Sequence, residues 1–323
     1  MKAKDLILHY AFSLGLVRWM RGKLHSFTLI NCIEVILSPL GLIKYLLTSL
    51  QARIEWGGGQ TTYDLSVVAI AKDEGLYINE WIAFNKAVGV DHIYLYDNDS
   101  TDGLRKKISS YVDEGYVSYH LIRGKKRQCD AYNEAIDKYK YESKYMIFID
   151  VDEFVFPVSD QERLVDVIDN YFKDNKQIGG LSINWLLFGS SGKEQYDDDL
   201  VIERFTKRAK YEFDANKQYK VVVDPRKCFS FICPHYPMYL VGYYMVSDDG
   251  AKLKTDRFSS EYKTLRCNHY FTKSFEEFSI KRNRGMADRN QIRDMSDFER
   301  HDKNDEDDYE ILRYLSDVKK LLC

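Results

Sequence analysis

Cysteine, proline and glycine are all scarce in this chain of 323 residues. It has 6 cysteines, 5 prolines and 18 glycines, which excludes a disulfide framework, a collagen-like repeat and a disordered chain rich in proline and glycine. Charge of one sign is also lacking, since 47 Lys and Arg residues stand against 50 Asp and Glu residues, for a net charge of −3. No overall positive field attracts nucleic acid, so we expect no nucleic-acid partner. The sparse cysteines predict reduced thiols and a cytoplasmic setting.

Hydrophobic residues are plentiful, at 45% of the chain, and charged residues make up 30%. This balance is typical of a folded protein, and the length suits one large or two small domains with a real core. Aromatic residues reach 14%. They suit strand-rich cores and flat binding pockets without distinguishing between the two.

Residues 1–60 form an apolar and basic leader that we expect to be helical. Its stretch 6–17 has the length of a signal-peptide core, but His9 interrupts it. Residues 18–21, with two arginines and a tryptophan, follow where small residues would permit cleavage. Removal of the leader is therefore not expected.

The second half of the leader, 24–50, is apolar but contains Glu34, Pro39 and Lys44. No charge-free run reaches the roughly 18 residues that a membrane-spanning helix needs, and we expect none here. Two interpretations remain open. Basic residues can meet anionic headgroups while an apolar face enters the membrane interface, which gives a peripheral contact through residues 1–50. The alternative is a helical hairpin that packs on the protein's own core.

A tri-glycine at 57–59 separates the leader from the main domain, which we place at 61–287. Apolar runs of strand length then alternate with segments of helical spacing. The expected strands are 65–71, 92–96, 116–121 and 145–149, and the expected helices are 76–88 and 128–139. This alternation predicts an α/β fold with a mainly parallel sheet and helices on both faces. Residues 288–323 are expected to form an acidic linker and a C-terminal helix.

Polar and charged residues follow three of the predicted strands, at 72–74, 97–102 and 150–153. An open α/β sheet binds its ligands beyond the carboxyl ends of its strands. We therefore expect the functional site to be built from these three strand ends.

Asp150 and Asp152 directly follow an apolar strand. Side chains two residues apart on an extended chain point the same way, so both carboxylates can address one cation. Carboxylate oxygens suit Mn²⁺ or Mg²⁺, which keep positions open for a substrate phosphate. We predict a site for one of these ions that neutralises a departing diphosphate. Helix capping or simple solvation of the two acids is the alternative.

Several ordered blocks of the chain resemble glycosyltransferase family 92 and its bacterial family-2-like relatives, which have the GT-A fold. The resemblance covers about residues 65–286. Its blocks are 68–74, 80–85, 96–103, 148–154, 184–192, 203–205 and 268–274. It implies a Rossmann-like GT-A domain behind the helical leader.

The resemblance also implies a metal-dependent glycosyltransferase that moves a sugar from a nucleotide-sugar donor, expected to be a UDP-sugar, to a hydroxyl of a glycan or lipid-linked acceptor. Family 92 implies inversion at the sugar carbon. Polysaccharide or lipopolysaccharide biosynthesis, in the cytoplasm or at the inner face of the membrane, is the expected setting. The alternatives are a nucleotidyltransferase, a nucleotide-sugar hydrolase and a binding module with an inactive site; fold analogy selects neither sugar nor acceptor.

The candidate donor contacts lie at the strand ends and on two later segments. Side chains at the strand ends can hydrogen-bond a base and a ribose, or serve only turn and cap chemistry. Basic side chains can bind the diphosphate, or remain solvated. The expected nucleotide-sugar contacts are Lys72, Glu74, Asp97, Asp99, Arg127, Gln128, Asn133, Lys273 and Arg284.

His269 is the expected third metal ligand, because GT-A enzymes often complete the coordination with a late histidine. A buried structural histidine is the alternative. A zinc site built from Cys228, Cys233, His235, Cys267 and His269 is a weaker interpretation, since their spacing lacks the usual C-x2-C pairs.

The catalytic base of an inverting transfer is expected to be a carboxylate that takes the acceptor proton. Glu203 is the candidate because it lies in a matching block, although it can equally form a structural pair with Arg204. Other carboxylates have the same chemistry without further support, namely Asp197, Asp198, Asp199, Asp248 and Asp256.

Overall fold

The computed structural model describes residues 3–24, 26–54, 60–253, 262–283 and 294–323. Three features of the sequence interpretation lie outside these ranges: the tri-glycine 57–59, the donor contact Arg284 and the carboxylate Asp256. Within the described ranges the chain folds as an α/β protein behind an N-terminal group of helices, which confirms the predicted class.

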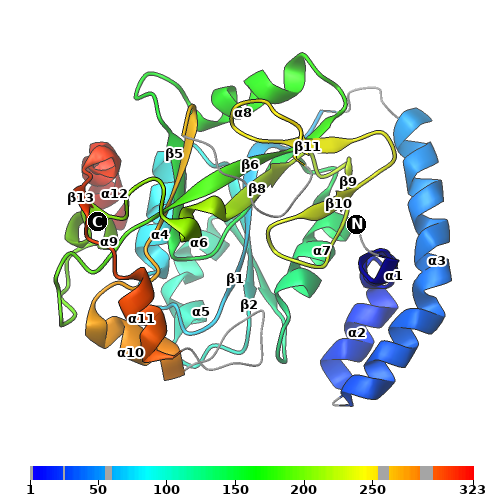
Figure 1. Ribbon diagram of the computed structural model, residues 1–323, viewed down its shortest axis with the longest axis horizontal. Helices are drawn as coiled ribbons and strands as arrows, with labels where there is room; N and C mark the ends of the chain where they lie inside the picture. Colours follow the sequence, from blue (N-terminus) through cyan, green and yellow to red (C-terminus); the bar gives the residue numbers. More distant parts are fainter. Residues whose placement is uncertain (1–2, 25, 55–59, 254–261, 284–293) are drawn as a thin grey trace.

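Nine strands form one central sheet (Figure 1). They are β1 (Tyr63–Ala71), β2 (His92–Asp97), β3 (Val117–Leu121), β4 (Ser143–Phe148), β5 (Glu153–Pro157), β6 (Ile178–Leu187), β8 (Tyr219–Val223), β11 (Tyr244–Val246) and β12 (Leu265–His269). Their order is β3-β2-β1-β4-β8-β6-β12-β5, with β11 beside β6. The pairs β1–β2, β1–β4 and β2–β3 are parallel, whereas β8 is antiparallel to both of its neighbours.

Helices and short strands surround this sheet. The helices are α1 (Ala3–Phe12), α2 (Gly15–Lys23), α3 (Phe27–Ile54), α4 (Ile78–Ala87), α5 (Leu104–Lys107), α6 (Ser109–Asp113), α7 (Gln128–Tyr139), α8 (Leu164–Lys173), α9 (Val201–Arg204), α10 (Phe275–Asn283), α11 (Met295–His301) and α12 (Leu315–Leu322), with 3-10 turns η1 (Asp214–Lys217) and η2 (Glu310–Tyr314). The short strands are β7 (Lys207–Arg208), β9 (Cys228–Phe231), β10 (Pro237–Tyr239) and β13 (Glu306–Asp307).

Alternate residues of β1 face opposite sides of the sheet. Val67 and Ala69 pack in one apolar cluster with α4 and α8, and Val68 and Ile70 pack in a second cluster with α7. A parallel sheet that is buried on both faces needs a continuous apolar run rather than an alternating one, which is the pattern of β1 in the sequence. The prediction of helices on both faces is therefore confirmed.

The strand directions bring four strand ends to one edge of the sheet. β1, β2 and β4 are mutually parallel, so the residues after Ala71, Asp97 and Phe148 meet there. β12 is parallel to β6, which like β4 is antiparallel to β8, so β12 ends at the same edge. His269, the last residue of β12, thereby reaches the strand ends that carry the predicted aspartates.

The leader forms α1, α2 and α3, which lie together at one side of the molecule (Figure 1). α3 continues without a break through Glu34, Pro39 and Lys44. Its segment Thr28–Ala52, with 25 residues, is long and apolar enough to cross a membrane by length and composition. The expectation that charges rule out such a helix is therefore wrong on these two criteria.

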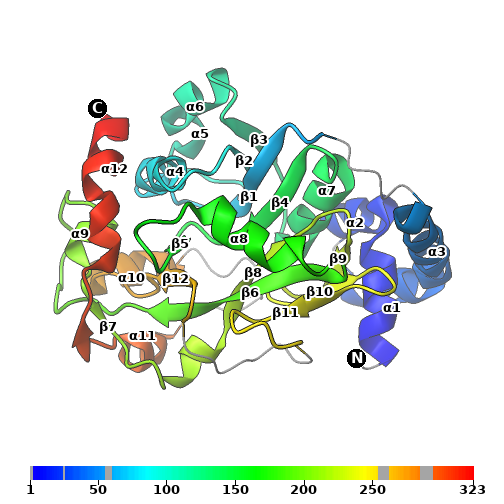
Figure 2. The same ribbon diagram turned by 90° about the horizontal axis from the view of Figure 1, so that it is seen from above.

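The last part of the chain packs on the main domain at the side opposite the leader (Figures 1 and 2). α12 lies against α4. Asp308, which is buried, pairs with Arg208 and Arg266 at 2.8 Å each. The predicted acidic linker therefore contains residues that hold the C-terminal helix to the domain.

Candidate active site

The turns after β1 and β2 are fastened to each other. Oδ1 of Asp73 accepts a hydrogen bond from the Thr101 amide at 2.7 Å, and Oδ2 of Asp102 accepts one from the Gly75 amide at 2.5 Å. A side chain at Gly75 would meet Asp102 at 2.8 Å, which explains the glycine. The two turns therefore form one rigid polar rim beside the strand ends.

Asp97 and Asp99 hold the second of these turns in shape. The carboxylate of Asp97 is buried, and it accepts hydrogen bonds from the Ser100 amide at 2.9 Å and the Tyr119 hydroxyl at 2.7 Å. Asp99 is exposed and accepts from the Gly124 amide at 3.2 Å. Asp99 therefore lies beside the basic loop 123–126, while both oxygens of Asp97 already serve the turn.

The first strand end carries two further predicted donor contacts. Lys72 is exposed at the rim. Glu74 is half-buried, and its backbone carbonyl accepts hydrogen bonds from the Tyr77 and Ile78 amides at the start of α4. Lys72 is therefore accessible to a ligand, and Glu74 also begins a helix.

Asp150 lies beyond β4 and contacts two other elements. Its Oδ1 accepts a hydrogen bond from Nε2 of Gln128 at 2.7 Å, and its Oδ2 pairs with Nζ of Lys220 at 2.7 Å. Gln128 is the first residue of α7, and Lys220 lies on β8. The predicted donor contact Gln128 and the predicted metal ligand Asp150 are thus brought together.

Asp152 is buried between a lysine and a histidine. Its Oδ2 lies 2.5 Å from Nζ of Lys281 on α10, and its Oδ1 lies 3.7 Å from Nε2 of His269. Asp152, His269 and the neighbouring Glu153 place one potential ligand atom each within 4.8 Å of one another. The predicted metal ligands Asp152 and His269 are therefore adjacent, and Glu153 joins them.

Lys220 and Glu153 were not among the predicted site residues. Both are fully buried, and they lie 3.4 Å apart. A signal for Lys220 was present, because this lysine stands directly before three valines in a strand-like run. A lysine in such a position is buried and needs an acidic partner. Which acid it meets was decided by the pairing of β8 with β4.

The protonation states of the cluster differ from residue to residue. Burial tends to raise the pKa of Asp152, but the charge of Lys281 and the interaction with His269 outweigh it and hold that pKa well below its usual range. Burial raises the pKa of Glu153 well above its usual range, against the attraction of Lys220. Burial also lowers the pKa of His269, against the attraction of Asp152. At neutral pH we therefore expect an ionised Asp152 and a neutral His269.

This donor set fits Mn²⁺ or Mg²⁺ chemically. Within the ranges that the structure describes, Nδ1 of His269 and Oε1 of Glu153 are buried polar atoms with no hydrogen-bond partner. Such atoms are costly unless they bind something. A neutral imidazole and a carboxylate are accepted ligands of Mn²⁺, and an ionised Asp152 supplies the charge. The chemistry suits manganese better than magnesium, because Mg²⁺ prefers oxygen ligands alone.

Arg127 and Asn133 serve packing rather than the aspartate cluster. Nη1 of Arg127 donates to the carbonyl of Arg18 in α2 at 3.0 Å and pairs with Asp130 at 2.9 Å. The side-chain amide of Asn133 donates to and accepts from the backbone of Phe231, at 2.8 and 2.7 Å. These two predicted donor contacts therefore hold the leader and β9 to α7.

Lys273 lies close enough to influence the cluster. It is buried, and its Nζ lies 4.0 Å above the ring of Tyr77. Its charge helps to lower the pKa of Asp152, after the larger effects of burial, Lys281 and His269. Lys273 is thus a third buried cation near the carboxylates, after Lys220 and Lys281.

Glu203 lies on α9 and pairs with the C-terminal helix. Its two carboxylate oxygens lie 3.0 and 2.8 Å from Nζ of Lys319. Arg204, the alternative partner in the sequence, instead makes two hydrogen bonds of 2.9 Å to Glu277. No contact in the described ranges connects Glu203 to Asp150 or Asp152.

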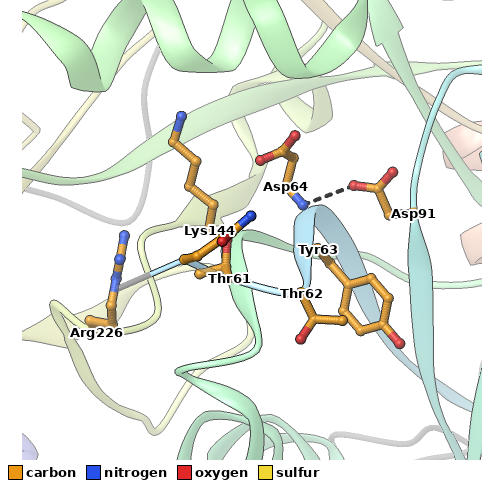
Figure 3. A pocket seen from close by; sticks show the side chains of 8 residues that line it. Thr61, Thr62, Tyr63, Asp64, Asp91, Lys144 and Arg226 are labelled. Carbon is orange, nitrogen blue, oxygen red and sulfur yellow. Dashed lines mark hydrogen bonds between the residues drawn. The ribbon is translucent and has the colours of Figure 1, made fainter. Parts of the chain in front are cut away.

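One hollow among the described residues lies away from this cluster. Its volume is about 740 Å³, and its lining includes Tyr63, Asp64, Asp91, Lys144 and Arg226 (Figure 3). Tyr63 begins β1, so the hollow lies at the amino end of that strand, opposite the candidate site. It contains none of the predicted site residues.

Comparison with known proteins gives one family. The model of glycosyltransferase family 92 matches residues 68–303. A family 92 protein of Ricinus communis is 23% identical over 230 residues, which cover 71% of this chain and 39% of that protein. A family 92 protein of Oryza sativa subsp. japonica is 27% identical over 165 residues, which cover 50% of this chain and 27% of that protein. The chain thus spans well under half the length of these relatives.

Solved structures with some likeness are more distant. Staphylococcus aureus TarS 1-349 in complex with UDP is 10% identical, with a TM-score of 0.37 over 64% of this chain and 60% of that chain. Glucosyl-3-phosphoglycerate synthase of Mycobacterium tuberculosis, in complex with Mn²⁺, UDP and glucosyl-3-phosphoglycerate, is 16% identical, with a TM-score of 0.26 over 42% and 47%. At these scores neither carries an argument about the site.

Proposed function

The chain belongs to glycosyltransferase family 92, and we propose that it transfers a sugar from a UDP-sugar to an acceptor hydroxyl in a metal-dependent, inverting reaction. The observation that supports this proposal is the meeting of Asp152 and His269 at the carboxyl edge of the sheet, where a nucleotide binds in an open α/β fold. A divalent ion held there would neutralise the charge that grows on the departing diphosphate.

Asp152 and His269 would hold the ion, and Asp150 is the third proposed ligand. Gln128 and Lys220 orient Asp150 through its two oxygens, so its carboxylate is fixed before a donor arrives. Glu153, placed beside Asp152 and His269, would complete the set. Orienting contacts of this kind commonly tune the affinity of a metal site.

The charges of the cluster favour joint binding of metal and donor. Asp150 and Asp152 carry two negative charges, and Lys220 and Lys281 compensate both. A divalent ion alone would therefore leave the site with excess positive charge. The diphosphate of a nucleotide sugar supplies the missing negative charge, so the ion should bind more tightly together with the nucleotide.

The remaining donor contacts are proposed along the rim. Lys72, Glu74 and Asp99 would meet a base and a ribose, and Asp97 would act indirectly by holding the turn in shape. Lys273 is the buried cation that would face the phosphates, with Arg284 in the same role. Arg127 and Asn133 would act indirectly, by fixing α7 and therefore Gln128.

Glu203 is the proposed catalytic base, and the acceptor is proposed to be a glycan or a lipid-linked sugar. Lys319 neutralises Glu203 in the structure, so a substrate would have to approach this pair. The proposed setting is polysaccharide or lipopolysaccharide biosynthesis in the cytoplasm or at the inner face of the membrane.

Product analysis with UDP-sugars tests the proposal. With Mn²⁺ and an acceptor extract, we expect a glycosylated product, and Asp152→Asn should lower the rate at least about 100-fold. Asp166→Asn, in an exposed ion pair with Arg163, is the matched control and should leave the rate unchanged. Release of free sugar without transfer would indicate a hydrolase. Nucleotide binding without any turnover would indicate an inactive module.

A further inference from the structure

Between Thr28 and Ala52, the charged residues of α3 face the protein and many of its apolar residues face outward, which is the reverse of a surface helix in a soluble protein. Its charged residues between Thr28 and Ala52 are Glu34 and Lys44, and both pair inward. Glu34 is buried and lies 2.7 Å from Arg21 of α2, and Lys44 lies 2.9 Å from Asp137 of α7. A surface helix of a soluble domain places such residues outward and its apolar residues inward.

The outward side of α3 is a continuous apolar face, which we call the apolar ridge. Ile36, Leu47 and Leu50 of the ridge are 71%, 62% and 57% exposed. The full ridge consists of Leu29, Val35, Ile36, Leu40, Leu42, Ile43, Leu46, Leu47 and Leu50. An exposed apolar surface of this extent is typical of a binding face.

Polar contacts and a close helix crossing fix the opposite side of α3 to the protein. A side chain at Gly41 would collide with the backbone of Tyr10 in α1, so this glycine permits the two helices to touch. Oγ of Ser49 accepts a hydrogen bond from the Val241 amide at 3.3 Å, and the ring of Tyr45 packs on Phe229 with centroids 4.9 Å apart. α3 therefore belongs to the folded domain and presents the ridge in a fixed direction.

These inward contacts distinguish a helix that lies along a membrane from one that crosses it. A crossing α3 would have to leave α1, α2 and α7 and carry Glu34 and Lys44 into hydrocarbon. Each charge there costs roughly 3 kcal/mol near the centre of a bilayer. A helix lying in the interface keeps both ion pairs and still buries the ridge.

Exposed cations lie near the N-terminal end of α3. Lys23 ends α2 and is exposed. The Arg123 side chain in the loop before α7 is 76% exposed and lies 3.4 Å from Asp99. Arg127 connects these parts by donating to the carbonyl of Arg18 in α2. Lys125 adds a further exposed charge to the loop. Exposed cations such as Lys23 and Lys125 beside an apolar ridge suit an anionic lipid surface.

We propose that the apolar ridge of α3 docks in the plane of an anionic phospholipid bilayer, with Lys23 and the loop 123–126 against the headgroups. This inference goes beyond the transferase reaction. Membrane binding can be measured separately from transfer, because vesicle binding needs neither donor nor acceptor. It places the enzyme at a membrane through a folded helix rather than a spanning one.

Vesicle flotation of the full chain tests the docking. The probes are phosphatidylcholine vesicles and the same vesicles with about 30% phosphatidylglycerol, and we expect stronger binding to the second. The triple variant Ile36→Glu, Ile43→Glu, Leu47→Glu should lower the partition coefficient at least about tenfold. A control with equal charge change, Tyr141→Glu, Tyr309→Glu, Leu322→Glu, alters exposed residues outside α3 and should bind normally.

Three results would overturn the proposal. If the triple variant and the unmodified chain bound the vesicles equally, the ridge would not be part of the membrane contact. If the unmodified chain were a dimer that did not bind vesicles, and the triple variant were a monomer, the ridge would bind a second copy of the chain instead of a membrane. Resistance of the bound protein to alkaline carbonate extraction would indicate a spanning helix instead.

Discussion

Lys281 Nζ lies 2.5 Å from Oδ2 of Asp152, and both side chains are buried. The ammonium thus supplies the positive charge that the ionised carboxylate of Asp152 needs in a dry environment. A divalent ion at Asp152 would have to compete with it. The ion pair between α10 and the turn after β4 therefore connects the fold of the C-terminal part to the proposed metal chemistry.

Lys281→Met should tighten Mn²⁺ binding at least about tenfold, because it removes the internal competitor for Asp152. The same change leaves a buried carboxylate unpaired, so without metal it should lower the free energy of unfolding by about 3 kcal/mol. Added Mn²⁺ should restore much of this loss. Calorimetric titration with Mn²⁺ and thermal melting with and without the ion measure both effects. Lys319→Met, in a partly exposed pair, is the control, and weaker Mn²⁺ binding by Lys281→Met would contradict the competition.

Lys220→Met should destabilise the sheet. Lys220 is fully buried on β8 and compensates Asp150 at 2.7 Å. Removal of one partner of such a pair costs about 3–5 kcal/mol in the free energy of unfolding. Urea denaturation measures this loss. Lys217→Met, in an exposed pair with Asp214, should cost less than about 1 kcal/mol, and a similar loss in both variants would argue against a special role for Lys220.

Glu203→Gln tests whether Glu203 is the catalytic base or only one partner of a surface ion pair. A lost base should lower kcat at least about 100-fold with little change in the KM for the donor. The stability should change by less than about 1 kcal/mol, because the pair with Lys319 is partly exposed. Steady-state kinetics of UDP release measure the effect. Lys319→Met breaks the same pair from the other side, and equal kcat values for the two variants would assign Glu203 to structure alone.

Glu80 should make stability depend on pH. Burial raises its pKa to about 7, although the Val201 and Ile202 amides donate hydrogen bonds to it. The folded protein therefore holds a proton that the unfolded chain releases near its ordinary pKa of 4.5. Stability due to this proton is full at low pH and falls by about 3 kcal/mol as pH rises from about 4.5 to 7.

Glu80→Gln removes that titration, so its unfolding free energy should fall less steeply than that of the unmodified chain over this pH range. Urea denaturation at several pH values gives both slopes. The variant also loses one amide hydrogen bond, which shifts its stability by a constant amount at every pH. Parallel slopes would show that Glu80 does not hold the extra proton.

Local patterns were sufficient for the strands β1–β4 and for the edge that carries the site. The apolar run of β1 and the polar residues after β2 and β4 predicted parallel strands with ligands at their carboxyl ends. The resemblance of the His269 block to family 92 placed this residue with the aspartates, and β12 brings it there. The hydrogen bond from Arg127 to the carbonyl of Arg18 in α2 could not be predicted, because it depends on how the leader packs against α7.

Local patterns in the sequence were enough to predict β1–β4, α4 and α7 and the acids that follow the strands, because these depend on neighbours within a few residues. The pairing of Lys220 with Asp150 and of Lys281 with Asp152 depends on how distant parts of the chain pack together. The same holds for α3, whose charges ruled out a membrane helix in the linear pattern but turn inward in the fold. A buried charge is stabilised only by a partner at contact distance, and that partner comes from elements distant in the chain.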